Sequence, residues 1–448
     1  MSKDRKCLEE MLQYFDSPES ICGIIDHFGE PLYLYNFDIT KNRCSALQSN
    51  LPDNVDIYYS LKANSSLGIA ARIKEYVSGA EVSSEGELMT ALKAGFKPSQ
   101  LIFVGPGKSE QALKAAIQAQ IRAIVVESRD EINMLVKLSY CSTSNIPIFF
   151  RLNPNFSASG TRLTMSGVSS QFGINAEEAS ALIPEILKKD NLRIIGLHIY
   201  LGTRILKSEH IAENTLNILK MCEELEDHLG YDFECIDIGG GLGVDYFENE
   251  TPLDLVDLKA RLTAIFASGP KRRLQRRYVL ETGRYLMADS GIYATKVLST
   301  KWSRGKHYVL TSGGTNHFFA NNYLSSFRKR SFPISILNKL KAKEFVKSTI
   351  CGPLCTPSDI LASDVNLAAD VEVGDTIGIF KAGAYGFSLG LMNFLSHFSP
   401  AEVLVEKKSA QLIRNHGNVE YLFQNQMLNG PRIELNKNDS NKVLKKTF

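Results

Sequence analysis

The sequence predicts an α/β fold in which an eight-stranded parallel (β/α)8 barrel is followed by a mainly antiparallel β domain. From about residue 55 to residue 285, short runs of β-branched and aromatic residues alternate with stretches of helical periodicity. Eight such runs can be counted, which is the strand number of this barrel. After about residue 290, strand-like runs follow one another with little helix between them. An open doubly wound sheet would show the same alternation, and the strand count favours the barrel.

The eight predicted barrel strands are Ile57–Lys62, Ala80–Ser84, Leu101–Val104, Ala123–Glu127, Ile146–Asn153, Ile194–Leu201, Cys235–Gly239 and Arg277–Gly283. The helix expected after the second strand has clear sequence signals for its start and its end. Glu85 and Glu87 place negative charge in its first turn, Leu88 and Leu92 share one face, and Gly95 ends it. The second strand, the acidic turn and this helix are therefore predicted to form one βα unit.

The remaining segments flank the barrel. A helix at Cys7–Phe15 and a strand at Pro31–Tyr35 precede it, and the strand is expected to pair with the C-terminal domain. The β domain is expected to contain Tyr293–Leu298, His307–Thr311 and Val371–Phe380. The predicted division is an N-terminal segment 1–40, a barrel 41–288, a β domain 289–435 and a Lys- and Asn-rich tail 436–448 that frays.

Composition narrows the class of protein. The 448 residues carry a formal charge of only +2, which argues against a dedicated nucleic-acid surface and favours a small-molecule substrate. The N-terminus has no apolar stretch of signal-peptide length, and no run approaches about 18 apolar residues, so export and membrane spanning are not expected. The eight cysteines form no CxxC pair and are expected to be reduced thiols in the cytosol. No metal site is predicted.

Two glycine-containing segments fall at the positions where barrels bind phosphate, after strands seven and eight. The seventh strand runs into Gly239-Gly240-Gly241, where missing side chains let backbone N–H groups approach an anion. The eighth ends at Gly283-Arg284, which adds a guanidinium suited to phosphate oxygens. A tight turn alone would explain one glycine cluster. A Rossmann dinucleotide site is disfavoured, because the cluster follows the seventh strand and lacks the G-x-G-x-x-G spacing.

Lys62 closes the first predicted strand. A buried lysine there could lose its proton and act as an amine nucleophile toward an aldehyde, whereas an ordinary surface lysine is the alternative. A lysine and a phosphate site in one barrel mouth indicate a phosphorylated aldehyde cofactor. Glu281 could then face a pyridine nitrogen and keep it protonated, which would strengthen the ring as an electron sink.

These segments occur in an order that resembles the diaminopimelate/ornithine decarboxylase family of pyridoxal-phosphate enzymes, of the barrel type called fold type III. The resemblance covers roughly residues 30 to 400. The matching segments are Tyr59-Ser-Leu-Lys62-Ala-Asn64, Glu81-Val-Ser-Ser-Glu-Gly-Glu87-Leu, Arg151-Leu-Asn-Pro154, Gln171-Phe-Gly173, Gly239-Gly-Gly241, Glu281-Thr-Gly-Arg284, Cys351-Gly-Pro-Leu-Cys355 and Gly383-Ala-Tyr385-Gly.

The resemblance implies pyridoxal 5'-phosphate as the cofactor, and a homodimer whose active sites are completed across the interface. It implies that Lys62 is the Schiff-base lysine and that Cys355, from the partner subunit, protonates the carbanion left by CO2. A buried structural thiol is the alternative for Cys355, and a turn aromatic for Tyr385. The other implied cofactor-binding residues are Glu81 near the cofactor, Gly240, Gly241, Gly283 and Arg284 around the phosphate, Glu281 at the pyridine nitrogen, and Tyr385 at the phosphate or the substrate carboxylate.

Two departures from the family pattern affect the expected substrate. Tyr200 stands where familiar members place a histidine over the cofactor ring, and it can stack but cannot serve as an imidazolium. His198 is either functional or a satisfied barrel histidine. Ser312 replaces a carboxylate that many members carry. The further substrate contacts expected are Arg284, Asp359, Tyr385 and Arg328, the last in a basic run, 328–330, that is more often only solvated surface.

The expected function is therefore decarboxylation of an amino-acid-type substrate. The segments Cys355–Asp359 and Asn393–His397 resemble the specialised-metabolite subgroup, which acts on glutamyl-carrier-protein or on siderophore intermediates. The substrate is accordingly expected to be a specialised-metabolite intermediate that could be joined to an acyl carrier protein. The alternatives left open are a meso-diaminopimelate decarboxylase of lysine biosynthesis, an alanine-racemase-like isomerase and a non-catalytic protein that binds the cofactor.

Overall fold

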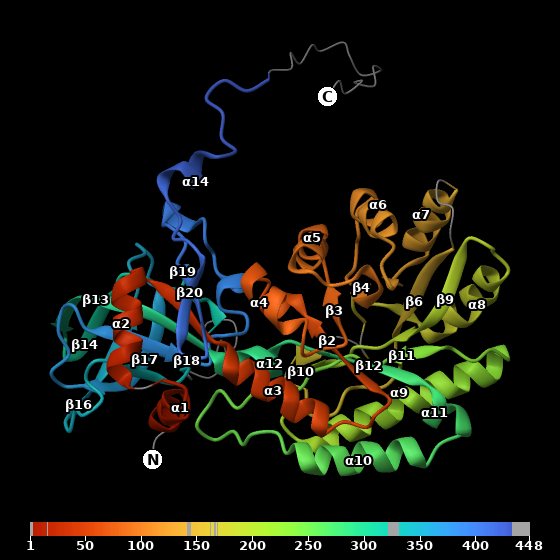
Figure 1. The fold of residues 1–448 in the computed structure, drawn as a ribbon, viewed down its shortest axis with the longest axis horizontal. Coiled ribbons are helices and arrows are strands. Elements are labelled where there is room, and N and C mark those ends of the chain that lie inside the picture. The colour runs from red at the N-terminus through yellow and green to blue at the C-terminus, as the bar shows by residue number, and fades with distance from the viewer. Residues whose placement is uncertain are drawn as a thin grey trace.

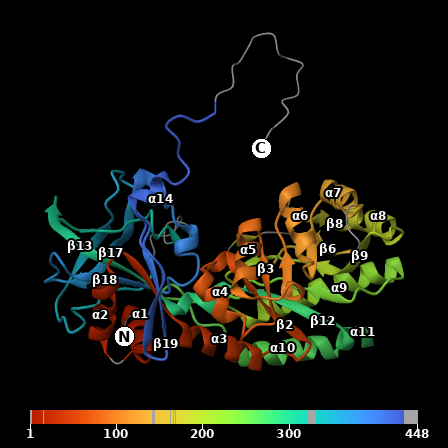
Figure 2. The same ribbon diagram turned by 45° about the horizontal axis from the view of Figure 1, so that its top comes forward.

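The computed structural model describes residues 3–15, 17–140, 145–161, 163–164, 167, 169–320 and 331–431. The predicted tail, 436–448, lies outside these residues, as does Arg328. Within them, two bodies lie side by side along the long axis of the molecule: a barrel ringed by helices, and a sheet domain in which the described chain begins and from which its last residues lead away (Figure 1, Figure 2).

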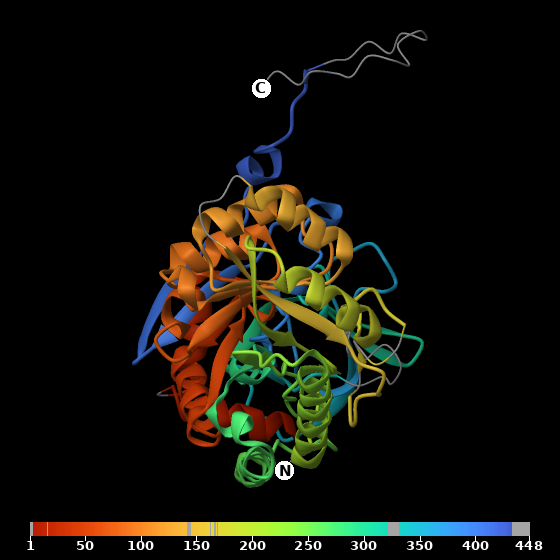
Figure 3. The same cartoon turned by 90° about the vertical axis from the view of Figure 1, so that its right-hand side faces the viewer.

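The barrel prediction is confirmed. Each of the eight barrel strands pairs in parallel with the next, and the last pairs with the first, which closes the ring (Figure 3). In ring order the strands are β2 (Val55–Ser60), β3 (Gly79–Val82), β4 (Leu101–Phe103), β5 (Ala123–Val126), β6 (Ile146–Asn153), β9 (Leu192–His198), β11 (Cys235–Asp237) and β12 (Arg277–Thr282).

Several of the helices that cover the barrel begin at a side-chain cap. Ser84, Ser109 and Ser128 each accept a hydrogen bond from a backbone N–H in the first turn of the following helix. Gly95, at a φ of 93°, ends the helix that Ser84 begins. The main barrel helices are α3 (Phe37–Ser49), α4 (Leu67–Ile73), α5 (Glu85–Ala94), α6 (Glu110–Ala119), α7 (Arg129–Ser139), α8 (Ala176–Leu187), α9 (Ser208–Leu229) and α10 (Leu255–Ala267).

The second sheet has the strand order β17-β16-β14-β13-β1-β19-β20, with β18 also pairing with β13 and β15. Most pairings are antiparallel, while β1–β19 and β14–β16 are parallel. Its strands are β1 (Leu32–Asn36), β13 (Gly291–Ser303), β14 (Lys306–Thr311), β15 (Ile334–Ile336), β16 (Phe345–Cys351), β17 (Ile360–Ala368), β18 (Thr376–Phe380), β19 (Ala401–Glu406) and β20 (Ser409–Arg414).

Two helices of the N-terminal segment pack on this sheet. The helix α1 (Lys3–Leu12) begins earlier than the predicted Cys7–Phe15, and α2 (Pro18–Phe28) was not predicted. Both helices bury apolar side chains in a core that they share with β1, β13 and β19. The N-terminal segment therefore belongs to the sheet by packing as well as by strand pairing. No helix in the described ranges is long and apolar enough to cross a membrane.

The barrel mouth is tied to the sheet domain by hydrogen bonds close to Lys62. The amide of Asn64 donates to the carbonyl of Gly383 at 3.1 Å, and the backbone N–H of Tyr385 donates to the carbonyl of Ala63 at 2.7 Å. These bonds hold the Gly383–Tyr385 segment against the turn that carries Lys62, so both domains contribute to one site.

Candidate active site

Lys62 lies at the C-terminal end of the first barrel strand, where the chain leaves β2 in a short 3-10 turn, Leu61–Ala63. Its Nζ lies 2.9 Å from Oε1 of Glu81, which is buried near the end of β3. The hydroxyl of Ser83 donates to the same Glu81 oxygen at 2.8 Å. The other oxygen, Oε2, is buried with no hydrogen-bond partner. The amine is thus held by a rigid carboxylate at the barrel mouth.

The charge state of Lys62 is set by its neighbours as well as by its burial. Burial favours the neutral amine, but the negative charges of Glu81 and Glu281 outweigh it and hold the pKa of Lys62 well above its usual value. Against Glu81 the side chain is therefore an ammonium. To act as a nucleophile it must first pass a proton away, and the Glu81 carboxylate is the group in contact to take it.

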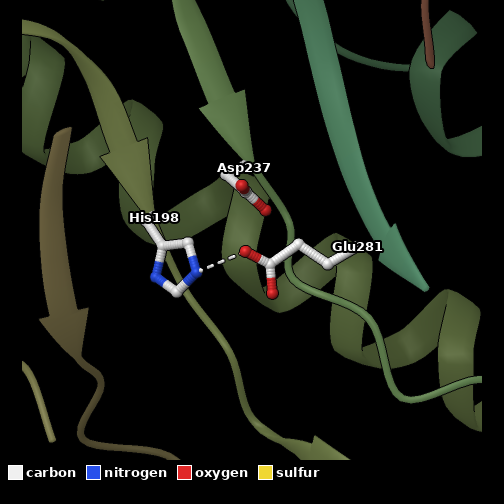
Figure 4. Close-up of side chains that lie close together, drawn as sticks. All are labelled: His198, Asp237 and Glu281. Atoms are coloured by element: carbon white, nitrogen blue, oxygen red, sulfur yellow. Dashed lines mark hydrogen bonds and ion pairs between the residues drawn. The ribbon is translucent and has the colours of Figure 1, made fainter. Parts of the chain in front are cut away.

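Glu281, at the end of β12, pairs with His198 from the end of β9. The two side chains are buried, and His198 Nε2 lies 3.2 Å from Glu281 Oε1 (Figure 4). Burial opposes ionisation of Glu281, but the neighbouring His198 and the ammonium of Lys62 overcome it and lower the pKa of this carboxyl. Glu281 is therefore an anion, the form needed to pair with a protonated pyridine nitrogen.

The glycine segments form turns with no room for side chains. A Cβ on Gly240 would overlap the carbonyl oxygen of Glu281, and one on Gly241 would overlap the carbonyl oxygen of Gly202. Gly241 also has a φ of 104°, a conformation that other residues rarely adopt. A Cβ on Gly283 would press on Ala63, next to Lys62. The three glycines therefore let the chain segments of the barrel mouth approach one another closely; turns of this kind can bind phosphate through their backbone amides.

Arg284 and Tyr246, which are buried, and Tyr385, which is partly buried, form a group with one positive charge beside these turns. The Arg284 guanidinium lies 4.4 Å from the centre of the Tyr385 ring, and its Nη1 donates to the Tyr246 hydroxyl at 3.2 Å. Its Nε is buried without a partner, which leaves a donor for an anion. Tyr385 adopts a φ of 57°, and burial raises the pKa of its phenol to about 12. Tyr246 was missed by sequence reasoning, although it follows the glycine cluster closely.

Tyr200, which the sequence predicts to stack on the cofactor ring, lies beside Lys62. The Lys62 Nζ is 5.4 Å from the centre of the Tyr200 ring. Burial raises the pKa of the Tyr200 phenol, so the group is neutral. The position thus offers an aromatic face to a bound ring but no imidazolium to protonate it.

Ser312 lies beside a carboxylate, that of Glu30, which the sequence analysis did not indicate. Its hydroxyl donates to Oε2 of Glu30 at 2.6 Å and lies 3.0 Å from the Thr295 hydroxyl. Glu30 comes from the N-terminal segment, two residues before β1. A carboxylate from a distant part of the chain therefore lies beside position 312.

Cys355 and Asp359 lie in the loop between β16 and β17. Cys355 is exposed, and its thiol makes no hydrogen bond or ion pair to any described residue. Asp359 is buried: Oδ1 accepts from the N–H and the hydroxyl of Thr315 at 2.7 and 2.8 Å, and Oδ2 accepts from the N–H of Leu354 at 2.8 Å. The expectation that Asp359 contacts substrate is not supported by this placement, because its oxygens are occupied within the sheet domain.

Asp359→Ala is expected to lower the free energy of unfolding by about 1–3 kcal/mol, because it leaves buried donors of Thr315 and Leu354 unpaired. It should also loosen the Cys355 loop and lower the turnover rate. Urea unfolding measures the first effect. As a control, Glu344→Ala, at an exposed position just before β16, should change stability by no more than about 0.5 kcal/mol. Equal stability of the two variants would show that Asp359 does not fasten the loop.

The structure thus brings Lys62, Glu81, Tyr200, Glu281 and the Arg284–Tyr385 pair to one barrel mouth with the three glycines. It does not bring Cys355 into contact with them within one chain, and Arg328 lies outside the described residues. A lysine amine, an anionic carboxylate, glycine turns and an unpaired buried guanidinium donor fit a phosphorylated pyridine aldehyde. Pyridoxal phosphate has these groups, so the site is suited to this cofactor.

Comparison with known proteins agrees with this geometry. Residues 38–288 match the family model "Pyridoxal-dependent decarboxylase, pyridoxal binding domain". The chain is 32% identical to the L-glutamyl-[BtrI acyl-carrier protein] decarboxylase of Niallia circulans, over 91% of this chain and 96% of that protein. It is 29% identical to the 2-[(L-alanin-3-ylcarbamoyl)methyl]-2-hydroxybutanedioate decarboxylase of Staphylococcus aureus, over 82% and 92%. It is similar to the crystal structure of Helicobacter pylori diaminopimelate decarboxylase complexed with L-lysine, with a TM-score of 0.79, 30% identity and coverage of 88% and 96%.

Proposed function

The chain belongs to the pyridoxal-dependent decarboxylase family, and from that premise we propose that it decarboxylates an amino-acid-type intermediate of a specialised pathway. The similarity over nearly the full length of an enzyme that acts on a glutamyl group joined to a carrier protein carries this proposal. A siderophore-type intermediate is the second candidate, favoured by the similarity to the Staphylococcus aureus enzyme. The substrate amine and α-carboxylate would enter the barrel mouth, and the rest of the substrate or its carrier would remain outside.

The residues of the barrel mouth would each bind a different part of the cofactor. Pyridoxal phosphate, when bound, supplies an electron sink for the bond to the departing carboxylate. Lys62 would attach the cofactor through Nζ, and the turns at Gly240, Gly241 and Gly283 would hold its phosphate. Arg284 would add positive charge there through its Nε donor, and Glu281 would pair with the pyridine nitrogen. Glu81 exchanges a proton with Lys62 across their 2.9 Å contact.

We further propose that the protein acts as a homodimer in which the partner's Cys355 completes the site. Two observations support this. The thiol of Cys355 is exposed and has no hydrogen-bond partner among the described residues of its own chain. The hydrogen bonds that Asp359 accepts from Thr315 and Leu354 fix the loop that carries Cys355, and the thiol of Cys355 is exposed on the surface of the sheet domain. From the neighbouring subunit, Sγ would donate the proton that replaces CO2.

The substrate class can be tested by CO2 release from a matched panel. We expect faster release from a glutamyl thioester of pantetheine or of a carrier protein, or from a citrate-linked amino acid, than from free meso-diaminopimelate. Free L-glutamate is the control that shows whether the thioester end of the substrate raises the rate of CO2 release. Release from meso-diaminopimelate at the higher rate would contradict the proposal and favour a lysine-biosynthesis enzyme. Exchange of the Cα proton with the carboxylate retained would instead indicate an isomerase.

A further inference from the structure

Asp237, the last residue of β11, is a buried carboxylate of the barrel mouth that sequence reasoning did not single out. Its side chain is fully buried. One oxygen, Oδ1, accepts the backbone N–H of Gly239 at 2.8 Å, and the other, Oδ2, is buried with no hydrogen-bond partner. The side chain points toward Glu281 and His198, and the ligand atoms of the three residues lie within 4.8 Å of one another (Figure 4).

The groups around Asp237 make its ionised form unfavourable. Glu281 faces it from β12 and Glu81 acts on it from β3, both with negative charge, while Lys62 is the opposing positive group. His198 lies beside it on β9, but the imidazole Nε2 is directed to Glu281 (Figure 4). Tyr58 of β2 and Cys235 of β11 are further titratable groups that interact with Asp237, and burial raises the pKa of both, so that they stay protonated.

Two carboxyl groups confined to a buried site do not both ionise without a large cost, so one of them keeps a proton. Glu281 has the better partners for a negative charge, since it contacts His198 and lies near the Lys62 ammonium. Asp237 has a single N–H donor and one unpaired oxygen. Burial, followed by the charge of Glu281, raises the pKa of Asp237 well above its usual value. The geometry and the charges thus assign the proton to Asp237.

We propose that Asp237 is a positioning residue that stays protonated and donates its carboxyl hydrogen from Oδ2 to the Glu281 carboxylate. Oδ1 meanwhile fixes the turn at Gly239 that opens the glycine cluster. One side chain would therefore orient both the carboxylate at the pyridine nitrogen and the turn at the phosphate. The inference rests on the cofactor-binding role proposed for Glu281, and it extends that site to a residue that need not touch the cofactor.

The Asp237→Asn variant tests whether Asp237 is protonated or ionised in the wild type. An asparagine amide accepts from Gly239 through its oxygen and donates to Glu281 through its nitrogen, as a protonated carboxyl does, whereas an ionised carboxylate only accepts. The matched controls are Asp237→Ser, which is too short to reach both partners, and Asp53→Asn, which removes a charge at an exposed turn. Holoenzyme of each variant is compared with the wild type.

The first measurement is the thermal unfolding midpoint of the holoenzyme between pH 5 and pH 9. A carboxyl whose folded pKa is raised gives stability that is complete below the unfolded pKa, about 4, and is lost as the pH rises toward the folded pKa. The wild type should therefore lose stability with pH relative to Asp237→Asn, so that the gap in midpoint widens in favour of the variant. Asp53→Asn should show no such widening. A gap that stays constant, or that favours the wild type increasingly, would overturn the proposal.

The second measurement is the retention of bound pyridoxal phosphate during dialysis. Asp237→Asn should keep the cofactor about as long as the wild type, while Asp237→Ser should lose it at least about tenfold faster. Loss from Asp237→Asn as fast as from Asp237→Ser would overturn the inference, because a negative charge at 237 would then be needed. Loss of cofactor from the wild type on dialysis against EDTA would also overturn it, since a cation would then bridge the three side chains. None of these readouts depends on which substrate is decarboxylated.

Discussion

Lys62→Ala is expected to abolish decarboxylation and to remove the long-wavelength absorbance of covalently attached pyridoxal phosphate. The variant lacks the amine that attaches the cofactor and the group that exchanges protons with Glu81 across 2.9 Å. Loss of a positioned acid–base group alone costs about 10²–10⁴-fold in rate, and loss of the covalent attachment adds to it. Absorbance titration with pyridoxal phosphate and CO2 release measure the two effects separately.

Lys108→Ala is the matched control for this variant. Lys108, in the loop after β4, likewise has its amine in contact with a carboxylate, that of Glu131 at 2.8 Å, and its side chain is buried, whereas that of Lys62 is partly exposed. Its removal should lower stability without removing the absorbance. The assignment of Lys62 would be refuted by wild-type protein that gains no such absorbance from the cofactor, or by a Lys62→Ala variant that keeps it.

Mixing a Lys62→Ala variant with a Cys355→Ala variant is expected to restore activity that neither has alone. If each site combines a lysine from one subunit with a thiol from the other, a hybrid dimer contains one intact site and one doubly damaged site. Random exchange in an equal mixture makes about half of the dimers hybrid, so activity should recover to about a quarter of the wild-type value. The measurement is CO2 release after subunit exchange.

The control for this complementation is Cys351→Ala in place of Cys355→Ala. Cys351 ends β16 and is half-buried, and burial, followed by the nearby charge of Asp359, raises the pKa of its thiol, so it is poorly placed to donate to a neighbouring subunit. Cys351→Ala alone should keep most of the activity. If labelled subunits exchange and the Lys62→Ala and Cys355→Ala mixture still has no activity, the shared site is excluded.

The barrel could be predicted closely because its strands are short apolar runs with one helix after each. The fifth strand, Ile146–Asn153, was predicted with the observed bounds. The first predicted strand extended to Lys62, two residues beyond the observed end. The reason is that the 3-10 turn that begins at Leu61 has the same apolar pattern as a strand end. The helix α2 was missed although Ser17 and Pro18 give it a cap and a first turn, since a single short helix has a weak pattern.

The site was predictable where its residues follow strand ends, and less so where they meet through the fold. Lys62, Glu281 and the glycine turns lie in recognisable positions along the barrel. The hydrogen bond between Glu30 and Ser312 joins residues from distant parts of the sequence, and no local pattern indicates it. Asp237 precedes the glycine cluster, and only the closed ring shows that it faces Glu281.

The place of β1 in the second sheet has a consequence for the order in which the chain can fold. This strand lies between β13 and β19, so Leu32 pairs with Ala294 on one side and with Ala401 on the other. During synthesis β1 emerges early, but it stays unpaired until the barrel and most of the β domain have been made. A polypeptide cut at the end of the barrel would leave the later fragment with an open slot between two strands. Such an exposed slot is a template for pairing with a β1 from another molecule, so exchange of this strand between subunits is the characteristic misassembly that this topology permits.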